Sequence, residues 1–213
     1  MLHRHLGNYF NCSLTRGFIM NTKNSALLII DGQNDFLTEG GALYEAVRPV
    51  ADENNLLQNL NDAIAKARLA NLTIINTAVA FSDGYAEAGD SPYGIFAAVA
   101  QSGGFIKGTW GAQSAEGLNL LDEDIFLEKA GMNAFLNKNL NKILEEKNIT
   151  NIVLAGLLTD ACVECTMRYA YDNGFEVSVL TDATATIDPD KQKSTIENSF
   201  PLFSKPMTTE QFA

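Results

Sequence analysis

Cys162 is the side chain in this 213-residue sequence whose type and position most favour covalent chemistry. It follows an apolar run over residues 152–158 and a short polar step, Thr159-Asp160-Ala161, and it opens a segment with helical spacing of apolar residues. A thiol at such a strand-to-helix turn lies beside unpaired helical N–H groups and the positive end of the helix dipole, which favour the thiolate. The position predicts a cysteine nucleophile, although a buried free cysteine is also a common packing residue.

The distribution of histidines limits what can activate that thiol. The chain has two, His3 and His5, both at the extreme N-terminus. A Cys-His pair, a Ser-His-Asp triad and a His-ligated zinc site are therefore unavailable unless the N-terminal segment folds back. If Cys162 is a nucleophile, its base must be a carboxylate that is helped by a cation.

Apolar runs alternate with helical patterns along the chain. Strands are predicted at 26–30, 72–79, 125–127, 151–157 and 175–180, and helices at 49–70, 133–147, 162–173 and 190–200. Residues 81–117 are Gly-rich and predict a long, functional loop with a short helix near 95–100. The alternation predicts an α/β fold, a three-layer α/β/α arrangement around a mainly parallel central sheet.

Three reactive side chains are expected to meet at one edge of that sheet. Asp31 ends the first strand, Lys129 follows the third and Cys162 follows the fourth. Ligands of parallel sheets bind beyond the carboxyl ends of the strands, so the three should converge on one crevice. Asp31 would take the thiol proton as general base, Lys129 would stabilise the thiolate, and Cys162 would attack a carbonyl carbon. The non-catalytic alternatives are that Asp31 caps the end of the strand and that Lys129 lies at the solvated surface.

Three short segments, in this order and spacing, resemble a known family. They are Asp31-Gly32-Gln33-Asn34-Asp35-Phe36, Lys129 with Ala134-Phe135, and Thr159-Asp160-Ala161-Cys162-Val163. The pattern resembles the isochorismatase-like cysteine hydrolase superfamily, which includes nicotinamidases, N-carbamoylsarcosine amidohydrolases, ureidoacrylate and biuret hydrolases, and isochorismatases. The resemblance covers about residues 25–205. It implies a catalytic triad of Asp31, Lys129 and Cys162, no cofactor, and a homodimer or homotetramer.

The resemblance also implies a non-proline cis peptide at Leu157–Leu158. The backbone amides of Leu158 and Cys162 are expected to form the oxyanion hole that holds the negative oxygen of a tetrahedral intermediate. Candidate substrate-binding residues are Gln33, Phe36, Trp110 and Tyr171. Gln33 has an alternative role, bracing Asp31.

Two departures from the family pattern narrow the expected substrate. Nicotinamidases of the family carry an Asp-x-His…His metal site after the second strand, whereas residues 80–85 of this chain contain no histidine. No metal is therefore expected. Isochorismatases usually lack the cysteine, so Cys162 favours cleavage of a small amide, ureide or carbamoyl compound. Isochorismate hydrolysis is the alternative, and a non-catalytic or redox-sensing relative, suggested by Cys165 near Cys162, is another.

The composition of the chain limits which binding partners and which cellular compartment are expected. A net charge of −11 argues against nucleic acid and anionic membranes as partners. Three cysteines, Cys12, Cys162 and Cys165, form no disulfide framework and favour a reducing, cytoplasmic location. Residues 1–20 are expected to be a disordered tail or a start upstream of the functional one, with a transit peptide as the alternative. Residues 21–213 are expected to form a single domain.

Overall fold

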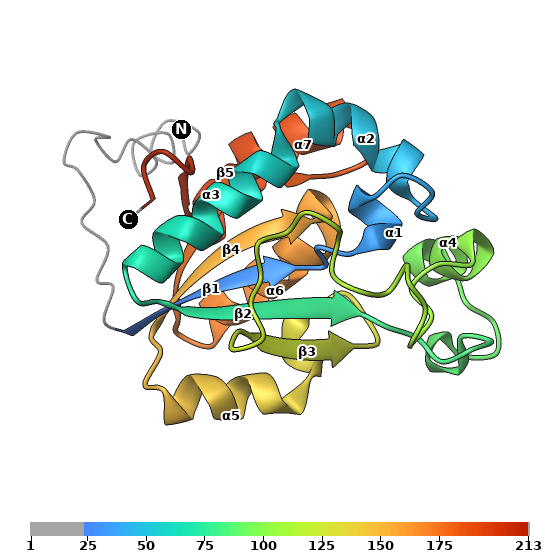
Figure 1. Cartoon of the computed structure of the whole chain (residues 1–213), viewed down its shortest axis with the longest axis horizontal. Coiled ribbons are helices and arrows are strands. Elements are labelled where there is room, and N and C mark those ends of the chain that lie inside the picture. Colours follow the sequence, from blue (N-terminus) through green and yellow to red (C-terminus); the bar gives the residue numbers. More distant parts are fainter. Residues whose placement is uncertain (1–23, 213) are drawn as a thin grey trace, which may run out of the picture.

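The computed structural model describes residues 24–212, and within them six strands form one sheet (Figure 1). The strands are β1 (Ser25–Ile30), β2 (Thr73–Val79), β3 (Ile125–Lys129), β4 (Asn151–Leu157), β5 (Glu176–Ala185) and β6 (Lys205–Met207). Their order is β3-β2-β1-β4-β5-β6, and every neighbouring pair is parallel. The predicted α/β fold with a parallel central sheet is confirmed.

Helices cover both faces of this sheet. They are α1 (Asn34–Leu37), α2 (Tyr44–Glu53), α3 (Leu56–Leu69), α4 (Gly94–Ser102), α5 (Lys138–Glu146), α6 (Glu164–Asp172), α7 (Pro189–Ser194) and α8 (Phe200–Phe203). Between residues 25 and 212 the chain also contains two 3₁₀ turns, η2 (Ala86–Ala88) and η3 (Ala134–Leu136), and two π turns, η4 (Thr159–Val163) and η5 (Thr195–Ser199). In Figure 1, α3 lies in front of the sheet and α6 behind it.

The central strand β1 shows why the sequence reads as a continuous apolar run. All six of its residues are buried, because successive side chains enter the cores on opposite faces of the sheet. Leu27 and Ile29 belong to the core under α3, and Leu28 and Ile30 to the core under α5 and α6. A strand buried on both faces carries no polar alternation, and it holds its carboxyl end rigidly.

The helix predicted over 49–70 is in fact two helices. The chain breaks between α2 and α3, where Asn55 adopts a left-handed backbone with φ 47°. The side-chain amide of Asn54 donates to the carbonyl of Thr184 at 2.8 Å, and that of Asn59 donates to Asp182 O at 2.9 Å. Asparagine tolerates the left-handed conformation, and these amides tie the break to β5. Periodicity alone does not reveal such a break, because both helices face the same core.

Other boundaries also differ from the prediction. The strand predicted over 175–180 runs on to Ala185, and the short α1 and edge strand β6 were not predicted. The helix predicted over 133–147 begins with the 3₁₀ turn η3. The last predicted helix, 190–200, consists of α7, η5 and the start of α8. Short elements are set by tertiary contacts rather than by local pattern.

The long loop after β2 contains α4 and is anchored at the end of β1 by Asp35. The Asp35 carboxylate accepts hydrogen bonds from the backbone N–H of Ala42 at 3.0 Å and of Phe105 at 2.6 Å. A Cβ at Gly111 would lie 2.3 Å from Asp35 Oδ1, so only glycine allows this close approach. One buried acid therefore fixes two parts of the loop beside the first strand.

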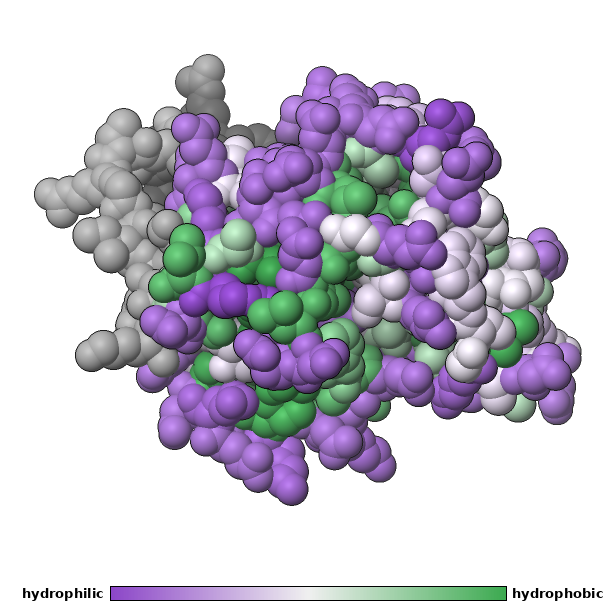
Figure 2. Space-filling model, in the orientation of Figure 1, coloured by the Kyte–Doolittle hydropathy of each residue, from purple (hydrophilic) through white to green (hydrophobic). Residues whose placement is uncertain are grey.

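The loop, rather than a helix, covers the outer part of the front face. In Figure 1 the segment between α4 and β3 crosses in front of β2, and Figure 2 shows hydrophobic residues gathered there. A groove of about 710 Å³ is lined there by Ile64, Leu69, Leu118, Leu120 and Leu121, among others.

The predicted N-terminal tail, residues 1–20, and Cys12 lie outside the described residues. Between residues 24 and 212, the structure contains no helix that is both long and apolar enough to cross a membrane.

Candidate active site

The carboxyl ends of β1, β3 and β4 bring together Asp31, Lys129 and Cys162. The ammonium Nζ of Lys129 lies 2.9 Å from Asp31 Oδ2. The Cys162 thiol is close enough to the Asp31 carboxylate and to the Lys129 ammonium for both groups to shift its pKa. The exposed fractions of the three residues are 0, 3 and 3%. Residues far apart in the sequence thus form one buried acid, base and thiol cluster.

Asp31 is positioned by a sharp turn out of β1. Its backbone has φ 52°, and its N–H still donates to Thr77 O at 2.7 Å, as if the sheet continued. Aspartate is among the residues that tolerate this left-handed conformation. Of its carboxylate oxygens, Oδ2 accepts from Lys129, whereas Oδ1 is buried and has no hydrogen-bond partner at conventional distance within the described chain. One oxygen is fixed by the lysine and the other is open to a reacting group.

Lys129 holds the site through two contacts. Its Nζ donates to Asp31 Oδ2 and, at 2.8 Å, to the carbonyl oxygen of Gly131. Burial alone would lower the pKa of Lys129, but the neighbouring Asp31 and Cys162 outweigh it, and the pKa is raised. The side chain is therefore an ammonium that neutralises Asp31.

The surroundings of Cys162 disfavour the thiolate, although the position at the strand-to-helix turn was expected to favour it. Burial raises the pKa of Cys162, and the negative charge of Asp31 raises it further. Lys129 and the backbone N–H of Leu158 lower it, but by less. Burial also raises the pKa of Asp31, against the opposing effect of Lys129. A dry, nearly neutral cluster does not support an additional anion, so the thiol must lose its proton as it reacts.

The turn between β4 and α6 places the thiol. The peptide bond Leu157–Leu158 is cis, as the family resemblance implied. The carbonyl of Leu158 accepts from the N–H groups of Ala161 and Val163, both at 3.1 Å, which winds Thr159–Val163 into the π turn η4. Cys162 therefore precedes α6 rather than opening it. The Leu158 N–H is directed at the sulfur, where the oxyanion hole was predicted.

A close approach of two strands precedes this turn. Gly156 has φ 117°, and a Cβ there would lie 2.0 Å from the carbonyl oxygen of Ile30. Only glycine lets β4 come this near to β1, one residue before Asp31. The distance between base and nucleophile therefore depends on a residue without a side chain.

Two neighbours of the turn are held by β5 and α7. Thr159 Oγ1 donates to Gln192 Oε1 at 2.6 Å, and Thr186 Oγ1 donates to the carboxylate of Asp160. No side-chain hydrogen bond caps η4 or α6, so Asp160 does not act as a helix cap although it stands at the start of the turn. Its carboxylate instead ties the turn to the end of β5.

The Gln33 side chain braces the turn after β1 through hydrogen bonds to backbone groups. Its Nε2 donates to Val79 O and Ala112 O, both at 2.9 Å, and its Oε1 accepts from the N–H of Val79 at 2.9 Å. The side chain is fully buried and joins the β1 turn to β2 and to the long loop. Phe36 is also buried, with its ring 4.6 Å from that of Phe105.

The remaining two candidates lie at different distances from the cluster. Trp110 is partly exposed; its carbonyl accepts from Asn34 Nδ2 at 2.8 Å, beside the β1 turn, and its indole N–H donates to Glu116. Tyr171 is exposed in the last turn of α6, where its ring packs against Phe203. It lies nine residues after Cys162, about 13 Å along a helix. The structure does not bring Tyr171 to the cluster.

Sequence reasoning missed Met132. Its Sδ lies 3.6 Å from the Cys162 Sγ, and the residue is partly buried beside the core that contains the thiol. The only signal in the sequence was its position three residues after Lys129.

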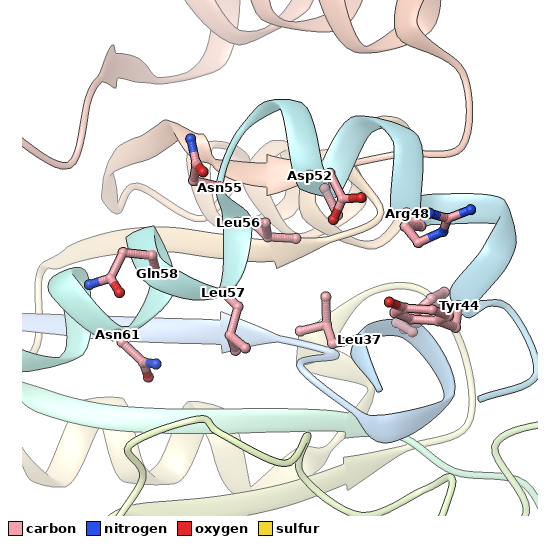
Figure 3. A pocket seen from close by; sticks show the side chains of 11 residues that line it. Leu37, Tyr44, Arg48, Asp52, Asn55, Leu56, Leu57, Gln58 and Asn61 are labelled. Atoms are coloured by element: carbon pink, nitrogen blue, oxygen red, sulfur yellow. The ribbon is translucent and has the colours of Figure 1, made fainter. Parts of the chain in front are cut away.

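A cavity of about 610 Å³ lies elsewhere, between α1, α2 and α3 (Figure 3). Figure 3 shows Tyr44, Arg48 and Asp52 at one end of it and Leu37 and Leu57 along its side. None of the cluster residues lines this cavity. Neither this cavity nor the groove beside α3 contains the reactive groups, because those groups are buried.

Comparisons with known proteins identify the family of this chain. The family described as Isochorismatase domain matches residues 25–211. A ureidoacrylate amidohydrolase from Klebsiella pneumoniae is 33% identical over 178 residues, 78% of this chain and 75% of that relative. Among solved structures, a cysteine hydrolase from Pseudomonas syringae has a TM-score of 0.74 at 24% identity, covering 91% of this chain and 92% of the other.

A more distant structure, the N-carbamoylsarcosine amidase from Thermoplasma acidophilum, has a TM-score of 0.66 at 21% identity, covering 88% of this chain and 97% of the other. The likeness to these solved structures shows a shared fold and nothing finer. The family match spans the whole sheet and contains Asp31, Lys129 and Cys162. The chain therefore belongs to the isochorismatase family.

Proposed function

We propose that the protein is a cofactor-independent cysteine hydrolase that cleaves a C–N bond in a small amide, ureide or carbamoyl compound. The relative named ureidoacrylate amidohydrolase supports the coarse assignment, an amidohydrolase-type enzyme. The observation that carries the finer proposal is the unequal use of the Asp31 oxygens. Lys129 occupies Oδ2, and Oδ1 is left without a conventional partner beside a neutral thiol.

The first half of the proposed reaction forms a thioester. Asp31 takes the proton of Cys162 while the sulfur attacks the carbonyl carbon of the substrate, and the carbonyl oxygen becomes an oxyanion. The backbone N–H groups of Leu158 and Cys162 would stabilise that oxyanion. Asp31 then gives its proton to the leaving nitrogen, and the C–N bond breaks.

The second half releases the acyl group. Water enters, Asp31 removes one of its protons, and the hydroxide attacks the thioester carbon. The sulfur leaves and regains the proton from Asp31, which restores the resting state. Throughout the cycle Lys129 stays charged and keeps the buried cluster close to neutral, because every step moves a proton between Asp31, sulfur, nitrogen and water.

The experiment that tests this proposal compares turnover of ureidoacrylate, N-carbamoylsarcosine and isochorismate by wild type, Cys162→Ala and Cys165→Ala. Cys162→Ala should lower kcat/KM for the nitrogen compounds on the order of a thousandfold or more, with the fold intact by circular dichroism. Cys165→Ala, the matched control on α6, should keep wild-type activity.

Each possible outcome separates the candidate functions. Full activity of Cys162→Ala on a ureide would contradict the thiol mechanism. Isochorismate turnover that survives this substitution would favour the vinyl-ether alternative. A disulfide between Cys162 and Cys165, with no hydrolysis of any small amide, would favour the redox-sensing relative.

Two further predictions from the sequence accompany the proposal. Cys162 and Cys165 are both free thiols, in keeping with a reducing, cytoplasmic compartment. A small-molecule substrate, rather than nucleic acid or a membrane surface, fits the net charge of −11.

A further inference from the structure

The segment at residues 130–133, between β3 and η3, lies directly beside the cluster. The Lys129 ammonium donates to the carbonyl of Gly131 at 2.8 Å and to Asp31 Oδ2 at 2.9 Å. One cation therefore fixes both the base and this segment. Any movement of the base relative to the segment must break one of these hydrogen bonds.

Met132 is the residue of this segment that contacts the nucleophile. The thiol of Cys162 donates toward Met132 Sδ across 3.6 Å, while Oδ1 of Asp31 has no conventional partner within the described chain. Cys162 is 3% exposed, whereas Met132 is only partly buried. The thioether is therefore in direct contact with the thiol and is itself more exposed than the thiol.

The segment is packed from outside as well. A Cβ added at Gly131 would lie 2.5 Å from Leu136 Cδ1 and 3.8 Å from Phe96 Cζ. Leu136 belongs to η3 and is 57% exposed, and Phe96 belongs to α4 in the long loop. The backbone at Gly131 is thus confined. We therefore expect movement in this segment to come from the Met132 side chain.

We infer that Met132 is a specificity-determining cover of the nucleophile. A carbonyl carbon must come within about 3–3.5 Å of the sulfur to react, which requires the thioether to move aside. Once displaced, the thioether forms one wall against the substituent on the carbonyl, and the thiol hydrogen turns to Asp31 Oδ1. Methionine suits this role because its unbranched side chain has three rotatable bonds. The inference rests on the proposed function, since it concerns the same nucleophile.

The first test measures access to the thiol without using turnover. Cys162 is alkylated with iodoacetamide and with the bulkier N-ethylmaleimide in a Cys165→Ala background, and mass spectrometry locates the label. Met132→Ala should raise the rate of labelling by N-ethylmaleimide about tenfold or more, and the rate of labelling by iodoacetamide by less. The reason is that no methionine side chain has to move away from the sulfur before the reagent can react. Met132→Leu, similar in volume, should stay near wild type.

A matched control and a selectivity measurement complete the test. Met167→Leu changes a fully buried methionine of the same core, on α6, and should leave labelling unchanged. Met132→Ala should also shift the ratio of kcat/KM for N-carbamoylsarcosine over ureidoacrylate about tenfold toward the former, whose carbamoyl nitrogen carries an extra methyl group.

The two proposals fail in different ways. If Met132→Ala is labelled at the wild-type rate by both reagents and keeps the wild-type selectivity ratio, then Met132 does not cover the sulfur. Retained hydrolysis by Cys162→Ala would overturn the thiol mechanism, and the labelling rates would still decide whether Met132 covers the sulfur.

Discussion

The charge of Asp31 has two opposite consequences for Cys162. In the proposed mechanism it makes Asp31 the base that takes the thiol proton, and it raises the pKa of that thiol. Lys129 offsets the second effect without removing the first, because it contacts the other carboxylate oxygen. At the residue scale, the proposed mechanism therefore requires Cys162 to keep its proton at rest and to pass it to Asp31 only when the substrate reacts.

Asp31→Asn separates these two consequences. With the negative charge gone and Lys129 still an ammonium, the pKa of Cys162 should fall relative to wild type, while turnover is lost because no base remains. Titration of the thiolate by ultraviolet absorbance measures the shift, and Cys162→Ser identifies the signal. Asp83→Asn, in an exposed position of the long loop, is the matched control. A thiol midpoint that stays in place or rises in Asp31→Asn would contradict this electrostatic account.

Lys129→Ala tests the charge balance through stability. It leaves Asp31 buried and unpaired, so the free energy of unfolding should fall by about 3–5 kcal/mol at neutral pH. Burial already raises the pKa of Asp31, and loss of Lys129 raises it further. The ionised carboxylate is the costly form, so the loss should be largest above that pKa and should shrink as the pH falls through it.

Urea denaturation of Lys129→Ala and wild type over a pH series measures this effect. Lys142→Ala is the control, since Lys142 forms an exposed pair with Glu146 at 3.7 Å, and it should change stability by less than about 1 kcal/mol. A loss for Lys129→Ala that does not depend on pH would indicate packing rather than charge as its cause.

At the scale of elements, β1 and the loop after β2 are joined by polar side chains that follow Asp31. Gln33 connects the β1 turn to Val79 and Ala112, and Asp35 connects it to Phe105. These contacts hold the loop that carries Trp110 and α4 beside the cluster. Conformational freedom of a long loop is thus restrained at its contacts with one short turn.

Gln33→Ala should weaken this junction. The substitution leaves the buried backbone groups of Val79 and the partly buried carbonyl of Ala112 without this partner, which costs on the order of 3 kcal/mol in the free energy of unfolding. Gln58→Ala, which removes an exposed amide on α3, should change stability by at most about 0.5 kcal/mol. Urea melts of both variants give the comparison. Unchanged stability with an altered KM in Gln33→Ala would instead favour substrate binding by Gln33.

At the scale of the whole molecule, the parallel sheet is flanked by α3 on one face and by α5 and α6 on the other, but its outer strands are less covered. Large apolar side chains remain exposed within residues 24–212, including Leu69 at 85% and Tyr93 at 87%. The hydrophobic groove beside α3 lies on the face shown in Figure 2. Exposed apolar area of this kind is typical of surfaces that are covered in an assembly.

The predicted homodimer or homotetramer is open to direct measurement. Size-exclusion chromatography with light scattering should give a mass of two or four times 23.1 kDa at micromolar concentration. Turnover per subunit should then fall on dilution only if a neighbouring copy supports the loop above the cluster. A purely monomeric mass at every concentration would contradict the prediction.

The fold class, and the meeting of Asp31, Lys129 and Cys162 at one edge of the sheet, were predictable from the sequence alone. Continuous apolar runs such as residues 26–30 are typical of strands buried on both faces, and such strands place the residues after them at one edge of a parallel sheet. Asp31, Lys129 and Cys162 could therefore be assigned to one site from their order along the chain. The sequence pattern is sufficient for this assignment because the carboxyl ends of parallel strands lie at the same edge of the sheet.

The electrostatics and the surroundings of that site depend on the tertiary structure. The neutral thiol results from how deeply Cys162 is buried and from its distance to Asp31, and neither is encoded locally. The Met132 contact, the full engagement of Gln33 by backbone groups and the remoteness of Tyr171 likewise depend on which segments pack together. Burial and contact between distant residues are properties of the whole packed chain, because each is set by atoms that other elements contribute.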